Sequence, residues 1–407
     1  MKALTLNKIS SDKLSLTPEL LLLFIPLTFI TGNWYLSALS LTGVFSFMLL
    51  RYLRFGDHEF TVPNIVPWLF ILTWGLYVVY ITPDPVIAVK YYVGTILIPF
   101  LIFIMFDNLR LSDKFLTHFV DAMLLSGVVL GMYSVYTFFS YGMRDGMRVP
   151  SFWNDFNMVS LYFMILFMFN LAFILKCANN SKKIFYFFTI FFISLGIYLT
   201  KTRGVWLAIV ISIAIFVIKR PKIIIPVIVI FGLMVLVFYN IIEDRFLSII
   251  NFEQDKSSLG RLQAWVSTVL IIQNNPFWGY GFDTYHLYQF DVMPYYIVEV
   301  PHPHNTYLRT IQEMGLIGAV IYYYLIIKAV FYSFNFRKYV TDPTYVKYLD
   351  GLQLSLVALL IAFNFEPYLS LFGTTTIAIW ILVALTFRIR KNARIKRLEL
   401  HGLNNLK

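Results

Sequence analysis

The sequence predicts an all-α polytopic membrane protein with about 12 transmembrane helices and one large outer loop that contains short helices. Hydrophobic residues make up 59% of the 407 and charged residues 14%, whereas a soluble domain is roughly 45–50% apolar and about 25% charged. The apolar residues gather in runs of about 17–25, the length at which a helix crosses a bilayer core. These runs do not alternate with period two, as the strands of a membrane barrel would.

The apolar runs divide the chain into four parts. We expect nine spans in residues 1–241, an outer loop in 242–305, three more spans in 306–388 and a basic tail in 389–407. In chain order, the predicted spans are 16–31, 34–53, 65–82, 87–106, 116–140, 153–176, 184–200, 204–219, 222–241, 306–334, 349–367 and 370–388.

The basic residues orient the chain. With the N-terminus inside, most of the 33 Lys and Arg fall in cytoplasmic segments, so the positive-inside rule predicts two cytoplasmic termini. The net charge of +11 therefore implies no nucleic acid, and the basic tail is most simply an anchor on anionic membrane lipids. Cys177 is the one cysteine, which excludes an internal disulfide.

Nine Lys and Arg fall on the outer side, which the positive-inside rule predicts to be poor in cations. Snorkelling to lipid phosphate is the favoured interpretation for Lys90, Arg245, Lys256 and Arg309. As a group, the outer cations also indicate an anion held at the interface, because the arginine fork binds phosphate oxygens bidentately. The other members of this group are Arg144, Arg148, Lys201, Arg203 and Arg261.

Two of these arginines stand out by their surroundings. Arg203 lies in a short outer turn, where Gly204 permits close approach and the following helix offers an N-terminus that favours anions. Arg261 follows Gly260 where a polar loop enters an amphipathic helix that reaches about Gln273. Arg144 and Arg148, in another outer loop, are weaker candidates.

His304 and Asn305 lie where the chain returns to the membrane, and Gly315 and Gly318 follow on a helix that they would allow to pack closely. A histidine has a reference pKa of about 6.5, so at this junction it can accept a proton from a substrate hydroxyl. Capping of the following helix is the alternative role. His302 and His304 have a poor spacing for metal without a nearby third ligand, so we expect no metal.

These motifs resemble the O-antigen ligase family, whose superfamily also includes O-antigen polymerases and protein O-oligosaccharyltransferases. The resemblance has one small departure, Ala319, at the position after the second glycine. Phe365-Glu366-Pro367 is weakly similar to a Glu-bearing segment of some members. The motifs are Thr202-Arg203-Gly204, Gly260-Arg261 with Trp265, Pro276-Phe-Trp-Gly279-Tyr-Gly281, and His304-Asn305-x9-Gly315-x-x-Gly318.

The resemblance implies an inverting glycosyl transfer, independent of metal or cofactor, at the periplasmic face of a bacterial inner membrane. The donor would be an O-antigen on undecaprenyl pyrophosphate and the acceptor lipid A–core. Arg203 and Arg261 correspond to the family's essential arginines and His304 to its essential histidine, so we expect these three to be catalytic. The residues expected to bind substrate are Arg144, Arg148, Lys201, His302, Asn305 and Glu366.

Two alternatives remain open. An O-antigen polymerase would use the same donor with a second lipid-linked repeat unit as acceptor. A transporter of lipid-linked sugars would bind the diphosphate without chemistry, but it would more often carry mid-span ionisable residues and symmetric halves. The sequence shows neither feature, which favours an enzyme.

Overall fold

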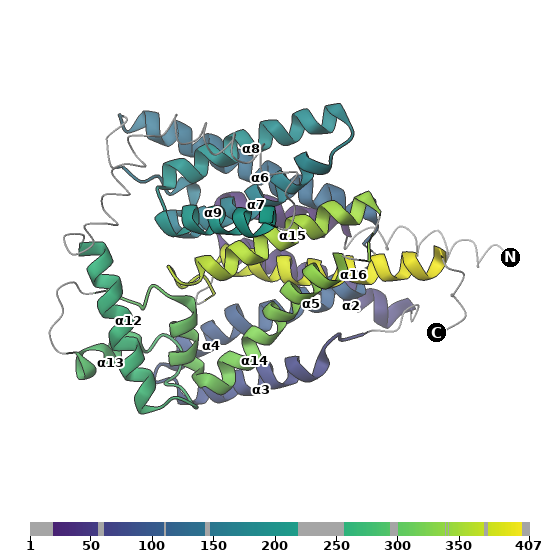
Figure 1. Cartoon of the computed structure of the whole chain (residues 1–407). Coiled ribbons are helices and arrows are strands. Elements are labelled where there is room, and N and C mark those ends of the chain that lie inside the picture. Colours follow the sequence, from purple (N-terminus) through teal and green to yellow (C-terminus); the bar gives the residue numbers. More distant parts are fainter. Residues whose placement is uncertain are drawn as a thin grey trace.

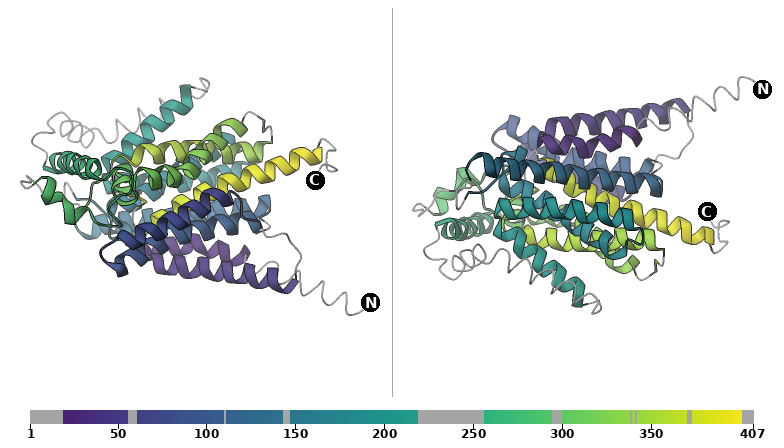
Figure 2. Two further views of the ribbon diagram at one scale, coloured as in Figure 1. Left: turned by 90° about the horizontal axis from the view of Figure 1, so that it is seen from below. Right: turned by 90° about the horizontal axis from the view of Figure 1, so that it is seen from above.

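Every regular element in the described part of the chain is a helix, and the helices run side by side in an elongated bundle (Figures 1 and 2). The structure, a computed structural model, describes residues 19–55, 61–109, 111–142, 147–218, 256–293, 300–337, 339–340, 342–369 and 373–400.

The elements up to the predicted outer loop are η1 (Phe29–Thr31), α2 (Trp34–Phe55), α3 (Ile65–Ile81), α4 (Pro85–Tyr92), η2 (Val93–Leu97), α5 (Ile98–Asn108), α6 (Asp113–Ser140), η3 (Ser151–Trp153), α7 (Phe156–Lys176), α8 (Asn180–Thr200) and α9 (Arg203–Ile218). Those that follow are α12 (Lys256–Asn274), α13 (Tyr285–Val292), α14 (Thr306–Arg337), α15 (Pro343–Ala362) and α16 (Thr374–Leu400).

The prediction of an all-α multi-pass membrane protein is confirmed. Seven helical segments of the described chain are long and apolar enough to span a membrane, and three shorter apolar helices accompany them. The expected number of 12 spans is not established, and the predicted span 222–241 lies outside the described residues. The orientation of the bundle stays a prediction.

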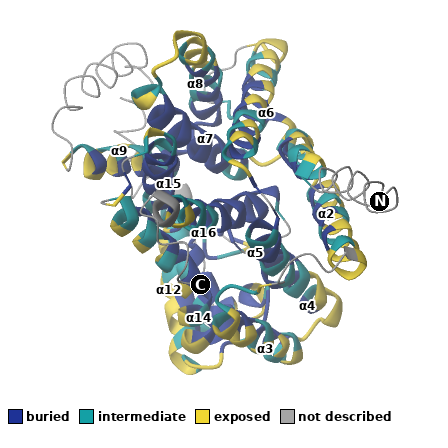
Figure 3. Ribbon diagram, turned by 90° about the vertical axis from the view of Figure 1, so that its right-hand side faces the viewer, coloured by how far each residue is buried: buried dark blue, intermediate teal, exposed yellow. Residues whose placement is uncertain are grey.

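Helices α7 and α15 form the centre of the bundle. The buried share of the most apolar stretch is 83% in α7 and 78% in α15. In α2, at the periphery, it is 22% (Figure 3). The predicted span 349–367 begins too late, because Asp342 caps α15 by accepting a bond of 2.8 Å from the Thr344 amide and Pro343 opens the helix. It also ends too late, since α15 stops at Ala362.

Helix α14 breaks at Gly315, whose φ of 68° is left-handed. Into this break fits the turn of residues 276–281: the Leu316 amide donates to the Pro276 carbonyl (2.8 Å) and the Gly281 amide to the Glu313 carbonyl (3.0 Å). A side chain at Gly315 would overlap the Phe277 carbonyl, and one at Gly318 would overlap the Trp74 ring. The two glycine-containing motifs are therefore the two sides of one backbone contact.

Proline also shapes the bundle, between α4 and α5. Pro99 has no amide hydrogen, so the Thr95 carbonyl lacks its helical partner and the backbone widens into the π-helical turn η2. The Tyr322 hydroxyl of α14 donates to that carbonyl at 3.0 Å. The carbonyl left without a partner by Pro99 thus forms a hydrogen bond that joins η2 to α14.

Helices α12 and α13 cap one end of the bundle, opposite the end where α16 finishes (Figure 1). At the α16 end, Lys391 of the predicted basic tail pairs with Asp107 at 2.9 Å, and α16 continues as a helix to Leu400. The candidate site lies at the α12 end.

Candidate active site

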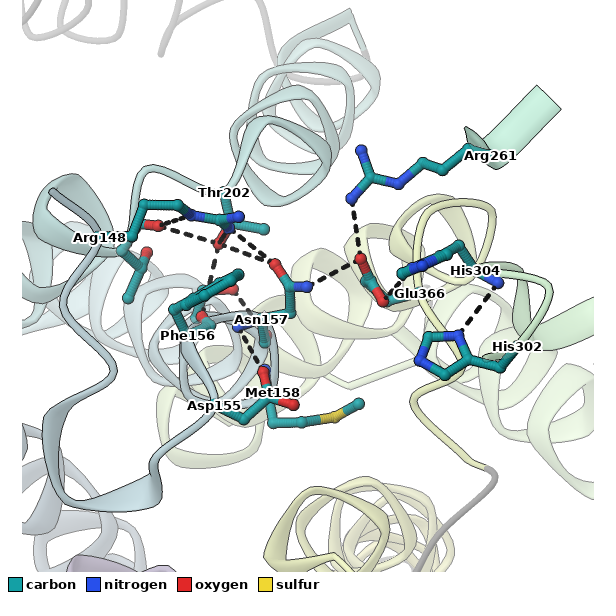
Figure 4. Close-up of polar contacts among 12 residues, drawn as sticks. Arg148, Asp155, Phe156, Asn157, Met158, Thr202, Arg261, His302, His304 and Glu366 are labelled. Atoms are coloured by element: carbon teal, nitrogen blue, oxygen red, sulfur yellow. Dashed lines mark hydrogen bonds and ion pairs between the residues drawn. The ribbon is translucent and has the colours of Figure 1, made fainter. Parts of the chain in front are cut away.

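The Glu366 carboxylate is the centre of the polar contacts at the α12 end (Figure 4). Its Oε1 accepts from Arg261 Nη2 at 3.0 Å and from Asn157 Nδ2 at 2.8 Å, and its Oε2 lies 2.9 Å from His304 Nδ1. These three partners come from α12, from the first turn of α7 and from the loop before α14. We call Glu366, His304, Arg261 and Asn157 the Glu366 cluster.

Thr306 fixes the loop of His304 against the segment of Glu366. Its amide donates to the Phe363 carbonyl (2.7 Å), and its hydroxyl donates to the Glu366 carbonyl (2.5 Å) and accepts from the Tyr368 amide (3.0 Å). His304 has a φ of 51°, a left-handed conformation that costs a non-glycine residue about 1 kcal/mol or more. Strain of this kind persists where the surroundings determine the geometry.

Glu366 is held as a carboxylate. Its burial raises its pKa, but the hydrogen bond and charge of His304 and the charge of Arg261 outweigh burial and bring the pKa below its usual range. An ionised Glu366 only accepts, so His304 Nδ1 carries the hydrogen and donates it. The lone pair of a neutral His304 ring then lies on Nε2, the nitrogen that would accept a proton from a substrate.

His302 is a neutral neighbour of His304. Its ring centre lies 4.2 Å from that of His304, and its Nδ1 accepts from the His304 amide at 3.4 Å. Burial, followed by the charges of His304 and Arg309, lowers the pKa of His302 to about 3. His302 therefore supports the turn as a neutral ring; its predicted contact with substrate stays a prediction.

Arg261 offers more donors than Glu366 uses. The Nη2 group binds Glu366, whereas Nε is buried and has no hydrogen-bond partner among the described residues. The indole Nε1 of Trp265, one helical turn along α12, is also buried without such a partner. Buried donors that lack partners cost about 1–3 kcal/mol each, so an anion beside α12 would stabilise this face.

Arg148 is committed to protein groups. Its Nε donates to the Thr200 carbonyl (2.9 Å), and its Nη2 donates to Asn157 Oδ1 (2.8 Å) and Thr202 Oγ1 (3.0 Å). Its guanidinium also lies over the Phe156 ring, 3.4 Å from the centroid. Arg148 thus ties the turn between α8 and α9 to the start of α7, and its predicted substrate contact is not tested.

Arg203 opens α9 beside the Glu366 segment. A side chain at Gly204 would lie 2.6 Å from Phe365 Cβ, so the start of α9 packs directly on the residue before Glu366. Lys201, in the turn before α9, is buried with a φ of 49°. The geometry therefore brings this turn and Arg261 to the same carboxylate-bearing segment; Arg144 lies outside the described residues.

Asn305 has a capping role. Its Oδ1 accepts from the Leu308 amide at 3.0 Å and so caps the N-terminus of α14. The capping alternative thus applies to Asn305, whereas the His304 side chain contacts Glu366. A substrate contact of Asn305 stays a prediction.

The snorkelling interpretation of Arg309 is wrong. Arg309 is 2% exposed and donates to Glu313 (2.7 Å), Asp283 (2.9 Å) and the Tyr91 hydroxyl (2.9 Å). These four residues, here called the Arg309 cluster, bind the turn before α13 to α14. Arg309 looks like an excess outer charge in the sequence, but Glu313 and Asp283 neutralise it inside the protein.

The described residues also contain one group with metal-ligand chemistry. One ligand atom each of His302, His304 and Glu366 lies within 4.8 Å of the others. However, each Glu366 oxygen already accepts hydrogen bonds, and Arg261 places a positive charge on the same carboxylate. A cation would have to displace Arg261 and compete with its charge, so the contacts fit an anion-binding site better than a metal site.

Asn157 and Thr306 belong to the site and were not predicted. A neutral amide at the start of an apolar span gives no charge signal, and a threonine after His304-Asn305 resembles an ordinary helix start. The available signal for Asn157 was its place after Asp155, an N-cap whose Oδ1 accepts from the Asn157 amide at 2.8 Å and so fixes where α7 begins.

Residues 188–323 match the family model described as O-antigen ligase. This segment of the chain is similar to an O-antigen ligase domain. This match confirms the resemblance on which the prediction rests, and members of the family act on lipid-linked glycans. The matched O-antigen ligase segment contains Arg203, Arg261 and His304, whereas Asn157 and Glu366 lie outside it. No curated protein matches the chain.

Proposed function

We propose that the protein is an O-antigen ligase, an inverting and metal-independent glycosyltransferase of lipopolysaccharide biosynthesis. It moves an O-antigen polysaccharide from undecaprenyl pyrophosphate to lipid A–core at the periplasmic face of the inner membrane. The observation that carries the proposal is the contact of 2.9 Å between His304 Nδ1 and Glu366 Oε2, on a carboxylate that also binds Arg261.

In this reaction His304 is the general base. The acceptor hydroxyl attacks the anomeric carbon of the donor while Nε2 of His304 takes the hydroxyl proton. The bond between the anomeric carbon and the diphosphate oxygen breaks, and undecaprenyl pyrophosphate leaves. Glu366 orients the His304 ring and stabilises the imidazolium that forms, the role that a carboxylate has beside a catalytic histidine in other enzymes.

Arg261 and Arg203 stabilise the leaving group. Negative charge develops on the diphosphate as the glycosidic bond breaks, and preorganised guanidinium groups in a water-poor site stabilise it strongly. Within the described part of the chain, the buried Nε of Arg261 has no hydrogen-bond partner and could make this contact. Arg203 stands at the N-terminus of α9, whose dipole favours the same charge. The lipid-linked diphosphate carries its own leaving group, so the reaction needs no nucleotide.

The test uses purified protein in detergent with lipid-linked O-antigen and lipid A–core, followed by gel separation of the glycolipids. The proposal predicts that polymer appears on lipid A–core in the presence of a chelator. Longer polymer on the polyprenyl carrier, with no transfer to lipid A–core, would identify a polymerase. Donor that stays intact would contradict enzymatic transfer and favour a transporter.

A further inference from the structure

Asn157 connects Glu366 to Arg148, a half-buried arginine that lies away from the proposed chemistry. Its Nδ2 donates to Glu366 Oε1 and its Oδ1 accepts from Arg148 Nη2, both at 2.8 Å (Figure 4). The two partners determine the orientation of the amide. The reverse orientation would set its NH₂ group against a guanidinium and its oxygen against a carboxylate.

The anchor behind Asn157 is rigid. Arg148 also binds the Thr200 carbonyl and the Thr202 hydroxyl and stacks on Phe156, so its guanidinium has partners on both sides of the turn between α8 and α9. The backbone of Asn157 is fixed as well, in the first turn of α7. The side chain therefore has little freedom to follow a moving Glu366.

We propose that Asn157, held by Arg148, is a positioning residue that fixes the Glu366 carboxylate and thereby the His304 ring. This inference rests on the proposed transfer reaction. The reason for a separate anchor is the position of Arg261, whose side chain is 23% exposed and donates to the same Oε1. If Arg261 reorients to donate to a diphosphate, Asn157 still donates to Glu366 Oε1 and holds it in place. The neutral amide of Asn157 is not attracted to the diphosphate charge.

Asn157→Asp separates positioning from structure. The substituted side chain keeps the shape of asparagine and an acceptor for Arg148, so that anchor survives as an ion pair. Toward Glu366, however, it presents a second carboxylate instead of a donor. We expect kcat to fall by about 10–100-fold with KM within about threefold, since small displacements of catalytic groups cost about this much. The acid limb of the kcat/KM profile should move to higher pH, because the added negative charge favours the protonated imidazole.

Asn170 supplies the matched control on the same helix. It is fully buried, its Nδ2 donates to Thr189 Oγ1 at 2.6 Å, and it lies more than three helical turns from Asn157. Asn157→Ala removes a half-buried amide and Asn170→Ala a fully buried one, so a purely structural role predicts that Asn157→Ala loses no more thermal stability and activity than Asn170→Ala. Positioning predicts a larger fall in kcat for Asn157→Ala at a similar melting temperature.

A second measurement does not depend on turnover. Diethyl pyrocarbonate modifies neutral imidazole, and peptide mass spectrometry can follow modification of His304 against pH in wild type and Asn157→Asp. The inference predicts that the midpoint of modification rises in the variant. A wild type that transfers glycan, with an unshifted midpoint and a normal kcat in Asn157→Asp, would overturn the inference. A wild type without transfer, despite a shifted midpoint, would instead contradict the proposed function.

Discussion

The Glu366 cluster pairs an arginine with one carboxylate and the Arg309 cluster pairs an arginine with two, at the same end of the bundle, but their surroundings differ. In the Arg309 cluster the arginine side chain is 3% exposed and donates to Glu313, Asp283 and Tyr91, so its charge is buried and paired. In the Glu366 cluster Arg261 is 23% and His304 19% exposed, and Arg261 Nε has no partner among the described residues. The first arrangement holds two segments together. The second leaves donors available to a ligand.

The strongest test of this difference compares the two arginines. Arg261→Met should lower turnover by about 10²–10³-fold, because it removes a positive charge that stabilises the leaving diphosphate. Its loss of stability should be smaller than that of Arg309→Met, because Glu366 keeps its contacts with Asn157 and His304. Arg309→Met should cost about 3–5 kcal/mol of stability, because it leaves the buried Glu313 carboxylate without its charged partner. The folded fraction of Arg309→Met should keep a nearly normal kcat. Thermal unfolding in detergent and the glycan-transfer assay provide both measurements, and similar profiles for the two variants would remove the distinction.

The carboxylates form a second matched pair. Glu366→Gln should lower kcat by about 10²-fold, because a neutral amide stabilises the imidazolium poorly and no longer fixes its tautomer. Glu313→Gln should mainly lower the unfolding temperature, because Arg309 loses half of its paired charge. A Glu366→Gln variant with normal kcat and a lowered unfolding temperature would show that Glu366 stabilises the fold and does not assist catalysis.

A smaller effect concerns acid stability. The pKa of Glu366 is lower in the folded protein than its usual value, so its ionisation stabilises the fold above about pH 4.3, and this contribution is lost as pH falls through the lowered pKa. The stability difference between wild type and Glu366→Gln should therefore shrink as pH falls below about 4.3. Unfolding curves of both proteins across this range would show it, and a difference that grows on acidification has the wrong sign.

The sequence predicts the apolar helices well where hydropathy is uninterrupted. It fails at the start of α15, because the predicted span 349–367 leaves out Lys347, which lies within the helix. In the fold, Asp350 pairs with Arg337 at 2.8 Å, and Lys347 lies 4.9 Å from the centroid of the Phe173 ring. A hydropathy profile lowers its value at every charged residue. It does not include the stabilising contact of a charge with a side chain from another helix.

The candidate site was predicted to a similar extent. His304 and Arg261 were identified because a charge or an imidazole is unusual at a membrane boundary. The link between His304 and Glu366 spans 62 residues and depends on how Thr306 joins two loops, which no spacing reveals. Asn157 carries no charge, so a search for unpaired cations could not select it.

A double-mutant cycle would show whether Glu366 acts through His304. The kcat of wild type, His304→Ala, Glu366→Gln and the double variant would be measured with the same lipid-linked donor and acceptor. If Glu366 works by positioning His304, Glu366→Gln should cost about 10²-fold in the wild type and less than about threefold once His304 is absent. An equal fall in kcat from Glu366→Gln with and without His304 would show that the two residues act independently. It would contradict a positioning role of Glu366.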